Sequence, residues 1–185
     1  MKFVTADLHL LHKNVLKFDS SQKHRGQYKG NLDSMHRGII TTWNDQVSPD
    51  DTVFLLGDIC CAKDKDIAHD LQYFLDIMNG HIVLVRGNHD TETTVRIMKE
   101  FGHEVVDYYE CRDFKDLICM SHYLHAAWNR SGYGSVHLFG HHHGSVDVKA
   151  GRCLDVGYDV WGKLLTLEEA YEFAKSREIC SPIRL

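Results

Sequence analysis

The sequence predicts an α/β protein in which two stacked β-sheets lie between outer helices, a four-layer α/β/β/α sandwich. Strand-like and helix-like apolar patterns alternate through the first half of the chain, which implies parallel strands joined by crossover helices. From Glu104 onward the pattern changes to a series of short strand-like segments. Two stacked sheets with helices outside them would bury both patterns.

The elements of the first half follow from continuous apolar runs and from helical spacing. Short apolar runs that end in polar residues predict buried strands at residues 3–6, 52–56 and 81–85. Apolar residues three or four positions apart predict helices over residues 31–47, 67–78 and 92–101. The polar segment 19–30 contains Gly26 and Gly30, so it is expected to be a loop.

The second half is expected to be rich in strands and to end in a helix. Short strands are predicted near residues 105–109, 117–120, 136–139, 145–148 and 152–156. The final helix begins at Thr166, where Glu169 completes a Thr-x-x-Glu capping box. Its inward-facing residues are expected to be Leu167, Ala170, Phe173 and Ala174. With only two prolines, no repeat and no low-complexity stretch, the chain is predicted to form one domain over residues 1–185.

The composition is that of an ordinary globular protein, with 43% hydrophobic and 25% charged residues. No apolar run approaches the roughly 18–20 residues that a membrane crossing needs, and the first residues do not read as a signal peptide. A cytoplasmic protein with no membrane partner is therefore expected. The six cysteines form no C-x-x-C pair, so we expect reduced thiols rather than a thiolate zinc site. The net charge of −5 argues against a long nucleic-acid partner, and the oligomeric state stays open, a homodimer included.

Five short polar clusters stand where the predicted strands end. They are Asp7-Leu8-His9, Gly57-Asp58, Gly87-Asn88-His89-Asp90, Ser121-His122 and Gly140-His141-His142-His143. Ligands of α/β proteins gather beyond the carboxyl ends of the strands. All five clusters are therefore expected to converge on one site.

The spacing within the clusters favours a metal site. Asp7 and His9 lie two residues apart, as do His141 and His143, and in an extended chain such residues project to the same face. Each pair can thus aim two donors at one small volume. A glycine permits close backbone approach before three of the polar residues, namely Asp58, Asn88 and His141.

The donor types also agree with a metal site. Carboxylate, imidazole and amide oxygen together suit divalent manganese, iron, zinc or nickel. Asp58 is the natural bridge between two ions, because its strand falls centrally among the clusters. Taken singly, each cluster is equally well explained by a turn or by a surface histidine patch. Their order, and their common position after apolar strands, together favour the metal site.

The ordered set D-x-H, G-D, G-N-H-D, H and G-H-x-H resembles the calcineurin-like metallophosphoesterases. The motifs run from Asp7 to His143, and the stretches 7–18, 43–44 and 155–162 look like the small bacterial and phage members of that family. The resemblance implies the layered sandwich of that family and two divalent metal ions, with manganese the first choice and iron, zinc, nickel or magnesium as alternatives. It implies seven ligands: Asp7, His9, Asp58, Asn88, His122, His141 and His143.

The resemblance also implies how these residues are divided. Asp7, His9 and His143 would hold the first metal. Asn88, His122 and His141 would hold the second, and Asp58 would bridge the two. His89 would be a catalytic histidine that faces the substrate without binding metal, and Asp90 would orient it. Many relatives carry an aspartate–arginine pair a few residues after the bridging aspartate, whereas this chain has Ile59-Cys60-Cys61-Ala62-Lys63-Asp64.

The expected activity is hydrolysis of a small phosphodiester, such as a nucleotide or cyclic nucleotide, by a metal-bridging hydroxide, with His89 as general acid. A phosphomonoesterase acting on a small metabolite or a phosphoprotein is the alternative. A nuclease is disfavoured by charge, and a non-catalytic scaffold by the complete ligand set. Residues beside the motifs could contact substrate or serve ordinary packing and surface roles; they are His12, Lys13, Arg25, Arg86, Tyr123, Trp128, Asn129 and Arg130.

Overall fold

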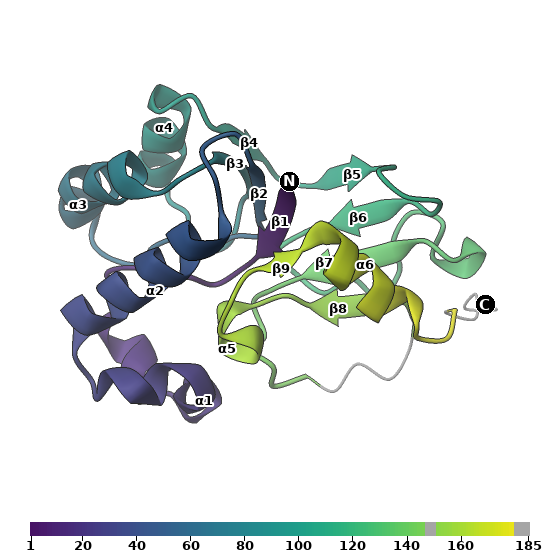
Figure 1. Cartoon of the computed structure of the whole chain (residues 1–185), viewed down its shortest axis with the longest axis horizontal. Coiled ribbons are helices and arrows are strands. Elements are labelled where there is room, and N and C mark those ends of the chain that lie inside the picture. Colours follow the sequence, from purple (N-terminus) through teal and green to yellow (C-terminus); the bar gives the residue numbers. More distant parts are fainter. Residues whose placement is uncertain (147–150, 180–185) are drawn as a thin grey trace.

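The computed structural model describes residues 1–146 and 151–179. Within these residues, two mixed sheets are flanked by helices (Figure 1), which confirms the predicted α/β/β/α sandwich. One sheet has the strand order β4-β3-β2-β1-β9, and the other has the order β5-β6-β7-β8. The helices α2, α3 and α4 lie together on the outer side of the first sheet in Figure 1.

The first sheet carries the N-terminal half of the site. Its strands are β1 Lys2–Thr5, β2 Thr52–Leu55, β3 His81–Val85, β4 Glu104–Val106 and β9 Leu165–Thr166. The strands β1 to β4 are parallel, and only β9 runs antiparallel to its neighbour β1. Parallel register therefore places the carboxyl ends of β1, β2 and β3 side by side at one edge of the sheet.

Three helices cover the outer face of this sheet, as predicted. They are α2 Leu32–Gln46, α3 Asp64–Ile77 and α4 Glu92–Glu100. The side chain of Asn31 caps α2 by accepting a hydrogen bond from the amide of Ser34, and Thr91 caps α4 in the same way. Their apolar faces bury Met35, Ile39, Trp43, Leu71 and Ile97 against the sheet.

The segment 19–30 is not the predicted loop but a series of short helical turns. The turns are η2 Asp19–Ser21, α1 Gln22–Arg25 and η3 Gly26–Tyr28, and a further turn, η1 Lys13–Lys17, precedes them. Turns this short leave no apolar period in the sequence. Side chains fix them instead, because Gln22 donates to the carbonyl of Leu16 and Arg25 is fully buried.

The second sheet is built from the short strands of the second half. They are β5 Tyr109–Cys111, β6 Ile118–Met120, β7 Val136–Phe139 and β8 Cys153–Asp155, with the turn η4 Ser131–Tyr133 between β6 and β7 and the short helix α5 Tyr158–Trp161 after β8. The single strand predicted at 105–109 is wrong, because the chain leaves the first sheet at Val106 and enters the second at Tyr109. Of the strand predicted at 145–148, Ser145 and Val146 are not in a strand, and the rest lies outside the described residues.

The final helix, α6 Leu167–Lys175, has the predicted capping box between Thr166 and Glu169. The prediction that Phe173 faces inward is wrong, since its side chain is 48% exposed and packs on Trp161. Tyr171 is buried in its place, and its hydroxyl donates to Asp116. This helix packs against strands of both sheets, so it closes the open side of the sandwich (Figure 1).

Three apolar clusters stabilise the described part of the fold. One lies between the first sheet and its helices, and the second lies between the two sheets, where Val4, Phe54 and Val83 meet Met120 and Leu138. A smaller third cluster contains Leu117, Cys119, Trp128, Phe139 and Cys153. Among the described residues, no helix has the length and apolar character that a bilayer crossing would require. Cys60, Cys61, Cys111 and Cys119 are free thiols, and Cys180 lies outside the described residues.

Candidate metal centre

The polar clusters that follow the strands meet at one edge of the sandwich. The backbone amide of Asp7 donates to the carbonyl of Gly57, and that of His9 donates to Asp58, so the segments after β1 and β2 are tied together. His122 follows β6, and His141 and His143 follow β7 in the second sheet. The site therefore lies between the two sheets, and each sheet contributes donors.

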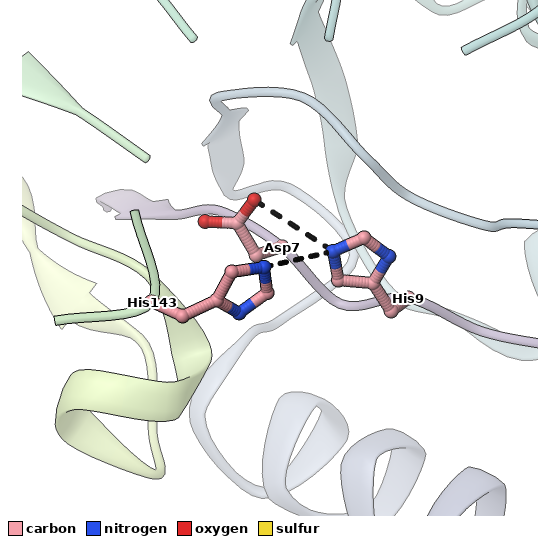
Figure 2. Close-up of side chains that lie close together, drawn as sticks. All are labelled: Asp7, His9 and His143. Carbon is pink, nitrogen blue, oxygen red and sulfur yellow. Dashed lines mark hydrogen bonds and ion pairs between the residues drawn. The ribbon is translucent and has the colours of Figure 1, made fainter. Parts of the chain in front are cut away.

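Asp7, His9 and His143 form the first group of donors, which we call the Asp7 side (Figure 2). The Nε2 atoms of His9 and His143 are 3.3 Å apart, and Nε2 of His9 is 4.0 Å from Oδ1 of Asp7. One ligand atom from each of the three residues lies within 4.8 Å of the others. These are the residues that the sequence assigns to the first metal.

Asn88, His122 and His141 form the second group, the His122 side. Oδ1 of Asn88 is 3.0 Å from Nε2 of His122, and the rings of His122 and His141 are 5.1 Å apart between centroids. The structure therefore brings these three predicted ligands together. Their exposure differs, because His122 is buried, His141 is half-buried and Asn88 is exposed.

Asp58 stands between the two sides. Its Oδ2 is 3.7 Å from Nε2 of His9 and 3.5 Å from Nε2 of His122. Asp7 is also central, since a second triad that could hold an ion consists of Asp7, Asp58 and His122. Both buried carboxylates thus face both sides, and two ions in this site would share at least one of them.

Hydrogen bonds fix the orientation of two of the imidazole rings. The Nδ1 atom of His122 lies 2.8 Å from the carbonyl oxygen of Leu56, which requires a proton on Nδ1 and leaves Nε2 as a lone pair that points into the site. The Nδ1 atom of His143 lies 2.5 Å from Oδ2 of Asp159, with the same consequence. His9 has no such partner, because its buried Nδ1 makes no hydrogen bond within the part of the chain that the structure describes.

A buried arginine supports the Asp7 side from behind. Arg25 donates from Nε to Oδ1 of Asp159 over 2.6 Å, and from its terminal nitrogens to the carbonyls of Asp7 and Leu8 over 2.6 and 2.9 Å. Arg25 and Asp159 both have fully buried side chains. Burial alone would raise the pKa of Asp159, but the hydrogen bond from His143 and the charge of Arg25 lower it, so this carboxylate stays charged.

Three glycines make room for donor side chains of the site. A Cβ atom on Gly87 would lie 2.3 Å from Oδ1 of Asp58, and one on Gly140 would lie 2.7 Å from Oδ2 of Asp7. A Cβ on Gly57 would lie 2.3 Å from Nδ1 of His122. Any side chain at these three positions would displace a donor of the site.

The backbone of the site is not the extended chain that the two-residue spacing suggests. Positive φ angles occur at Asp7 (58°), His9 (49°), Asp58 (57°), His141 (70°) and His143 (48°). Residues other than glycine rarely adopt this left-handed conformation, and such strain gathers at functional sites. The expectation that Asp7 and His9 share a volume holds, but a bent chain rather than an extended strand produces it.

The charges of the site fit a bound cation. Burial raises the pKa of Asp7 well above its ordinary value, and the neighbouring Asp58 raises it further. Burial also raises the pKa of Asp58 and lowers the pKa values of His9 and His122. A divalent ion would reverse the two carboxylate shifts, because its charge offsets buried carboxylate charge. It also suits histidines that burial keeps neutral, because a metal binds the deprotonated imidazole. The two triads of buried histidine and aspartate could thus bind metal ions.

Asp90 does not orient His89, in contrast to the sequence interpretation. Its carboxylate accepts hydrogen bonds from the backbone amides of Asp58, Ile59 and Gly87, over 2.8, 3.2 and 2.8 Å. Asp90 therefore joins the loops after β2 and β3. The ring of His89 contacts Cys61 instead, with Nδ1 3.3 Å from Sγ.

The structure also places the residues whose roles the sequence left open. Arg25 and Trp128 are buried and have packing and supporting roles. Tyr123 is 45% exposed and packs edge-on against His122 and His141, and His12 is half-buried beside His9. Sequence reasoning missed the supporting role of Asp159 and the contact between Cys61 and His89. The one signal for the latter was Cys61 in the segment where the resemblance leads one to expect an aspartate–arginine pair.

No protein-family model matches the chain. An uncharacterized protein of Methanocaldococcus jannaschii is 33% identical over 88 residues, which cover 48% of this chain and 46% of that protein. The match thus spans about half the length of that relative. The Gene 66 protein of Mycobacterium phage L5 is 24% identical over 200 residues, and 91% of each chain is covered.

A solved structure shows the same fold. A protein of unknown function from Aquifex aeolicus superposes with a TM-score of 0.67 at 18% identity, over 93% of this chain and 98% of that chain. A phosphopantetheinyl hydrolase from Mycobacterium tuberculosis gives a TM-score of 0.33 at 16% identity, over 65% of this chain and 40% of that chain. The first likeness establishes the fold alone, and the second is too weak to support an argument.

Proposed function

We propose that this protein is a dinuclear metallophosphoesterase of the calcineurin-like kind that hydrolyses a small phosphodiester. One observation carries the proposal: Asp58 lies between His9 and His122, with Oδ2 3.7 and 3.5 Å from their Nε2 atoms. A shared carboxylate between two sets of inward-facing imidazoles is the arrangement that a two-metal hydrolase needs. The ordered motifs of the sequence support the same class.

The proposal gives each group of residues a role. Asp7, His9 and His143 would hold one ion, Asn88, His122 and His141 the other, and Asp58 both. When bound, two such ions supply an activated water and neutralise charge on the phosphoryl oxygens. The protein orients the imidazole ligands. Arg25 and Asp159 hold the ring of His143, and the carbonyl of Leu56 holds the ring of His122.

His89 is the proposed proton donor. It is half-buried next to His9, with the two ring centroids 5.4 Å apart, so it lies beside the donor set while remaining reachable by a ligand. A leaving alkoxide needs a proton, and an imidazole within reach can provide it. We further propose that the chain forms one domain and that both bound ions are divalent, with manganese as the first choice. The proposed partner is a small phosphate ester.

Metal analysis combined with an ester screen tests the proposal. The purified protein, stripped with chelator and reloaded with manganese, is expected to bind two ions per chain and to hydrolyse bis(4-nitrophenyl) phosphate. Faster turnover of 4-nitrophenyl phosphate, a monoester, would replace the diesterase by a phosphomonoesterase. Failure to bind metal, or binding without hydrolysis of either ester, would contradict the proposal.

A further inference from the structure

The ring of His89 is held by a thiol rather than by a carboxylate. The Sγ atom of Cys61 lies 3.3 Å from Nδ1 of His89, within hydrogen-bonding range for sulfur. We infer that Cys61 is the positioning residue of His89: its thiol engages Nδ1, so that Nε2 is the ring nitrogen that carries the proton. The catalytic part of this inference rests on the proposed function, whereas the contact itself does not.

The nearby carboxylates are all occupied by other partners. Asp90 accepts three backbone amides, and Oδ1 of Asp58 accepts the backbone amide of His89 over 2.9 Å. The rings of His9 and His12 lie 5.4 and 6.1 Å from that of His89 between centroids, which is packing distance. Within the described residues, the thiol of Cys61 is therefore the side-chain group that hydrogen-bonds the His89 ring.

The chemistry of the thiol defines which nitrogen holds the proton. Burial raises the pKa of Cys61, and the charge of Asp58 raises it further, so the group remains a neutral thiol. A neutral thiol can donate its proton to the lone pair of Nδ1. The neutral imidazole then has its own proton on Nε2. The ring that protonates a leaving group is the imidazolium, which takes its second proton at Nδ1, where Sγ of Cys61 is a weak acceptor, and gives up the proton of Nε2. A carboxylate in the same place would accept from Nδ1–H instead.

The adjacent cysteine provides a matched control. Cys60 is fully buried, and its Sγ lies 3.8 Å from Oγ1 of Thr94, away from His89. Truncating Cys60 removes the same atom from the same segment without touching the His89 ring. A general effect of loosening this segment would therefore appear in Cys60→Ala as well as in Cys61→Ala.

The ring tautomer is a test that needs neither metal nor substrate. Nitrogen-15 chemical shifts of the metal-free protein at about pH 8, where an ordinary histidine is neutral, report which ring nitrogen is protonated, and His89→Asn identifies the signals. We expect the Nε2–H form in the wild type and in Cys61→Ser, and a mixture of both forms in Cys61→Ala. An unchanged tautomer in Cys61→Ala would overturn the inference.

Kinetics with two diesters provide the second test. Diphenyl phosphate and bis(4-nitrophenyl) phosphate are the same class of ester, but phenolate is the more basic leaving group and depends more on a proton donor. With manganese, Cys61→Ala is expected to lower kcat for diphenyl phosphate by about 10-fold or more, with KM and metal content unchanged. Its kcat for the nitrophenyl ester should stay within about 2-fold of the wild-type value. The ratio of the two kcat values should return to that of the wild type in Cys61→Ser and should stay at that value in Cys60→Ala.

The outcomes separate the two proposals. A wild-type protein that hydrolyses neither ester contradicts the proposed function, and the tautomer measurement then still judges the role of Cys61. An active wild type whose ratio of the two kcat values is unchanged in Cys61→Ala overturns the positioning role while leaving the phosphoesterase intact. Equal losses in Cys60→Ala and Cys61→Ala would likewise overturn it, because they would indicate a general effect on the segment.

Discussion

The Asp7 side and the His122 side of the site have similar donors but different support. Behind the Asp7 side, the fully buried ion pair of Arg25 and Asp159 holds the ring of His143 and two backbone carbonyls. The His122 side depends on one carbonyl, that of Leu56, and its His141 is half-buried while its Asn88 is exposed. The Asp7 side is thus the more buried of the two, and the His122 side is the more open to solvent.

This difference predicts different tasks for the two sides. A site that buried charges pre-organise loses little freedom on binding an ion, so we expect the Asp7 side to bind the tighter ion. The exposed donors of the His122 side leave room for a substrate oxygen and should exchange their ion more readily. The following variants test the proposed site, this contrast and the stability of the fold around them, starting from the largest effect.

His89→Asn removes the proposed proton donor without touching either side. Turnover of a diester with a poor leaving group should fall by roughly 10²–10⁴-fold, because general acid catalysis is lost. The metal content should stay at two ions per chain. Steady-state kinetics and elemental analysis of the same sample check both statements, and unchanged turnover would remove His89 from this role.

Arg25→Met should destabilise the whole fold. It leaves the buried carboxylate of Asp159 without its cationic partner, and breaking a buried ion pair typically costs about 3–5 kcal/mol of the free energy of unfolding. Urea unfolding of the metal-free protein measures the loss. Arg96→Met is the matched control, since Arg96 pairs with Glu100 on the exposed surface of α4, and its loss should cost no more than about 0.5 kcal/mol.

Asp58→Asn should weaken metal binding on both sides together. Asp58 faces both His9 and His122, and a neutral amide is a much poorer ligand than a carboxylate. Affinity for each ion is expected to fall by about 100-fold or more, at least as much as the loss of an outer-shell partner. Calorimetric titration with manganese would contradict the bridging role if only one of two binding events changed.

Asp159→Asn should affect the Asp7 side alone. The amide can no longer hold the proton on Nδ1 of His143 as firmly, and the loss of such an outer-shell carboxylate typically lowers metal affinity by about 10–100-fold. The same titration should show one weakened ion and one unchanged ion. Equal weakening of both ions would contradict the contrast between the two sides.

His137 makes stability depend on pH in a region away from the metal ligands. Its buried ring is 0% exposed, and burial lowers its pKa to about 3, with His125 adding to the effect. In the unfolded chain the pKa of His137 is about 6.5, so below this pH the unfolded chain binds a proton that the folded protein does not bind. Stability should therefore fall as the pH drops from 7 towards 3, by up to about 1.4 kcal/mol per pH unit for this group.

Urea unfolding of the metal-free protein at a series of pH values measures this slope. His137→Gln cannot titrate at this position. The free energy of unfolding of this variant should therefore fall less steeply between pH 6 and 4, with a slope smaller by up to roughly 1.4 kcal/mol per pH unit, the limit that one proton sets. His69→Gln is the control, because the side chain of His69 is 89% exposed and should leave the slope unchanged. Identical slopes in all three proteins would contradict the assignment to His137.

The strand ends were predictable because two simple signals coincide there. Asp7, Asp58 and Asn88 each follow an apolar run, and parallel strands end at one edge of a sheet. The strand predicted at 105–109 failed because a chain that crosses between two sheets remains apolar on both sides of the crossing. Apolar spacing thus locates the strands but does not assign them to a sheet.

The supporting residues could not be predicted from their neighbours in sequence. Arg25 lies in a polar segment that resembles a surface loop, and its partner Asp159 is 134 positions away. Asp90 follows His89 directly, which suggests a partnership that the loop geometry does not allow. Only a fold that brings separate segments together decides which carboxylate meets which ring.

The position of the Asp7 side between the two sheets has a mechanical consequence. His9 follows β1 of the first sheet and His143 follows β7 of the second, and the two residues are 134 positions apart in the chain. An ion held by both would fasten the two layers together in the way a cross-link does, and a covalent cross-link over a 100-residue loop contributes about 4–5 kcal/mol. Removing the ion with a chelator should therefore weaken the packing between the two sheets before any helix unfolds. The first measurable change should be faster amide hydrogen exchange along β1 and β7.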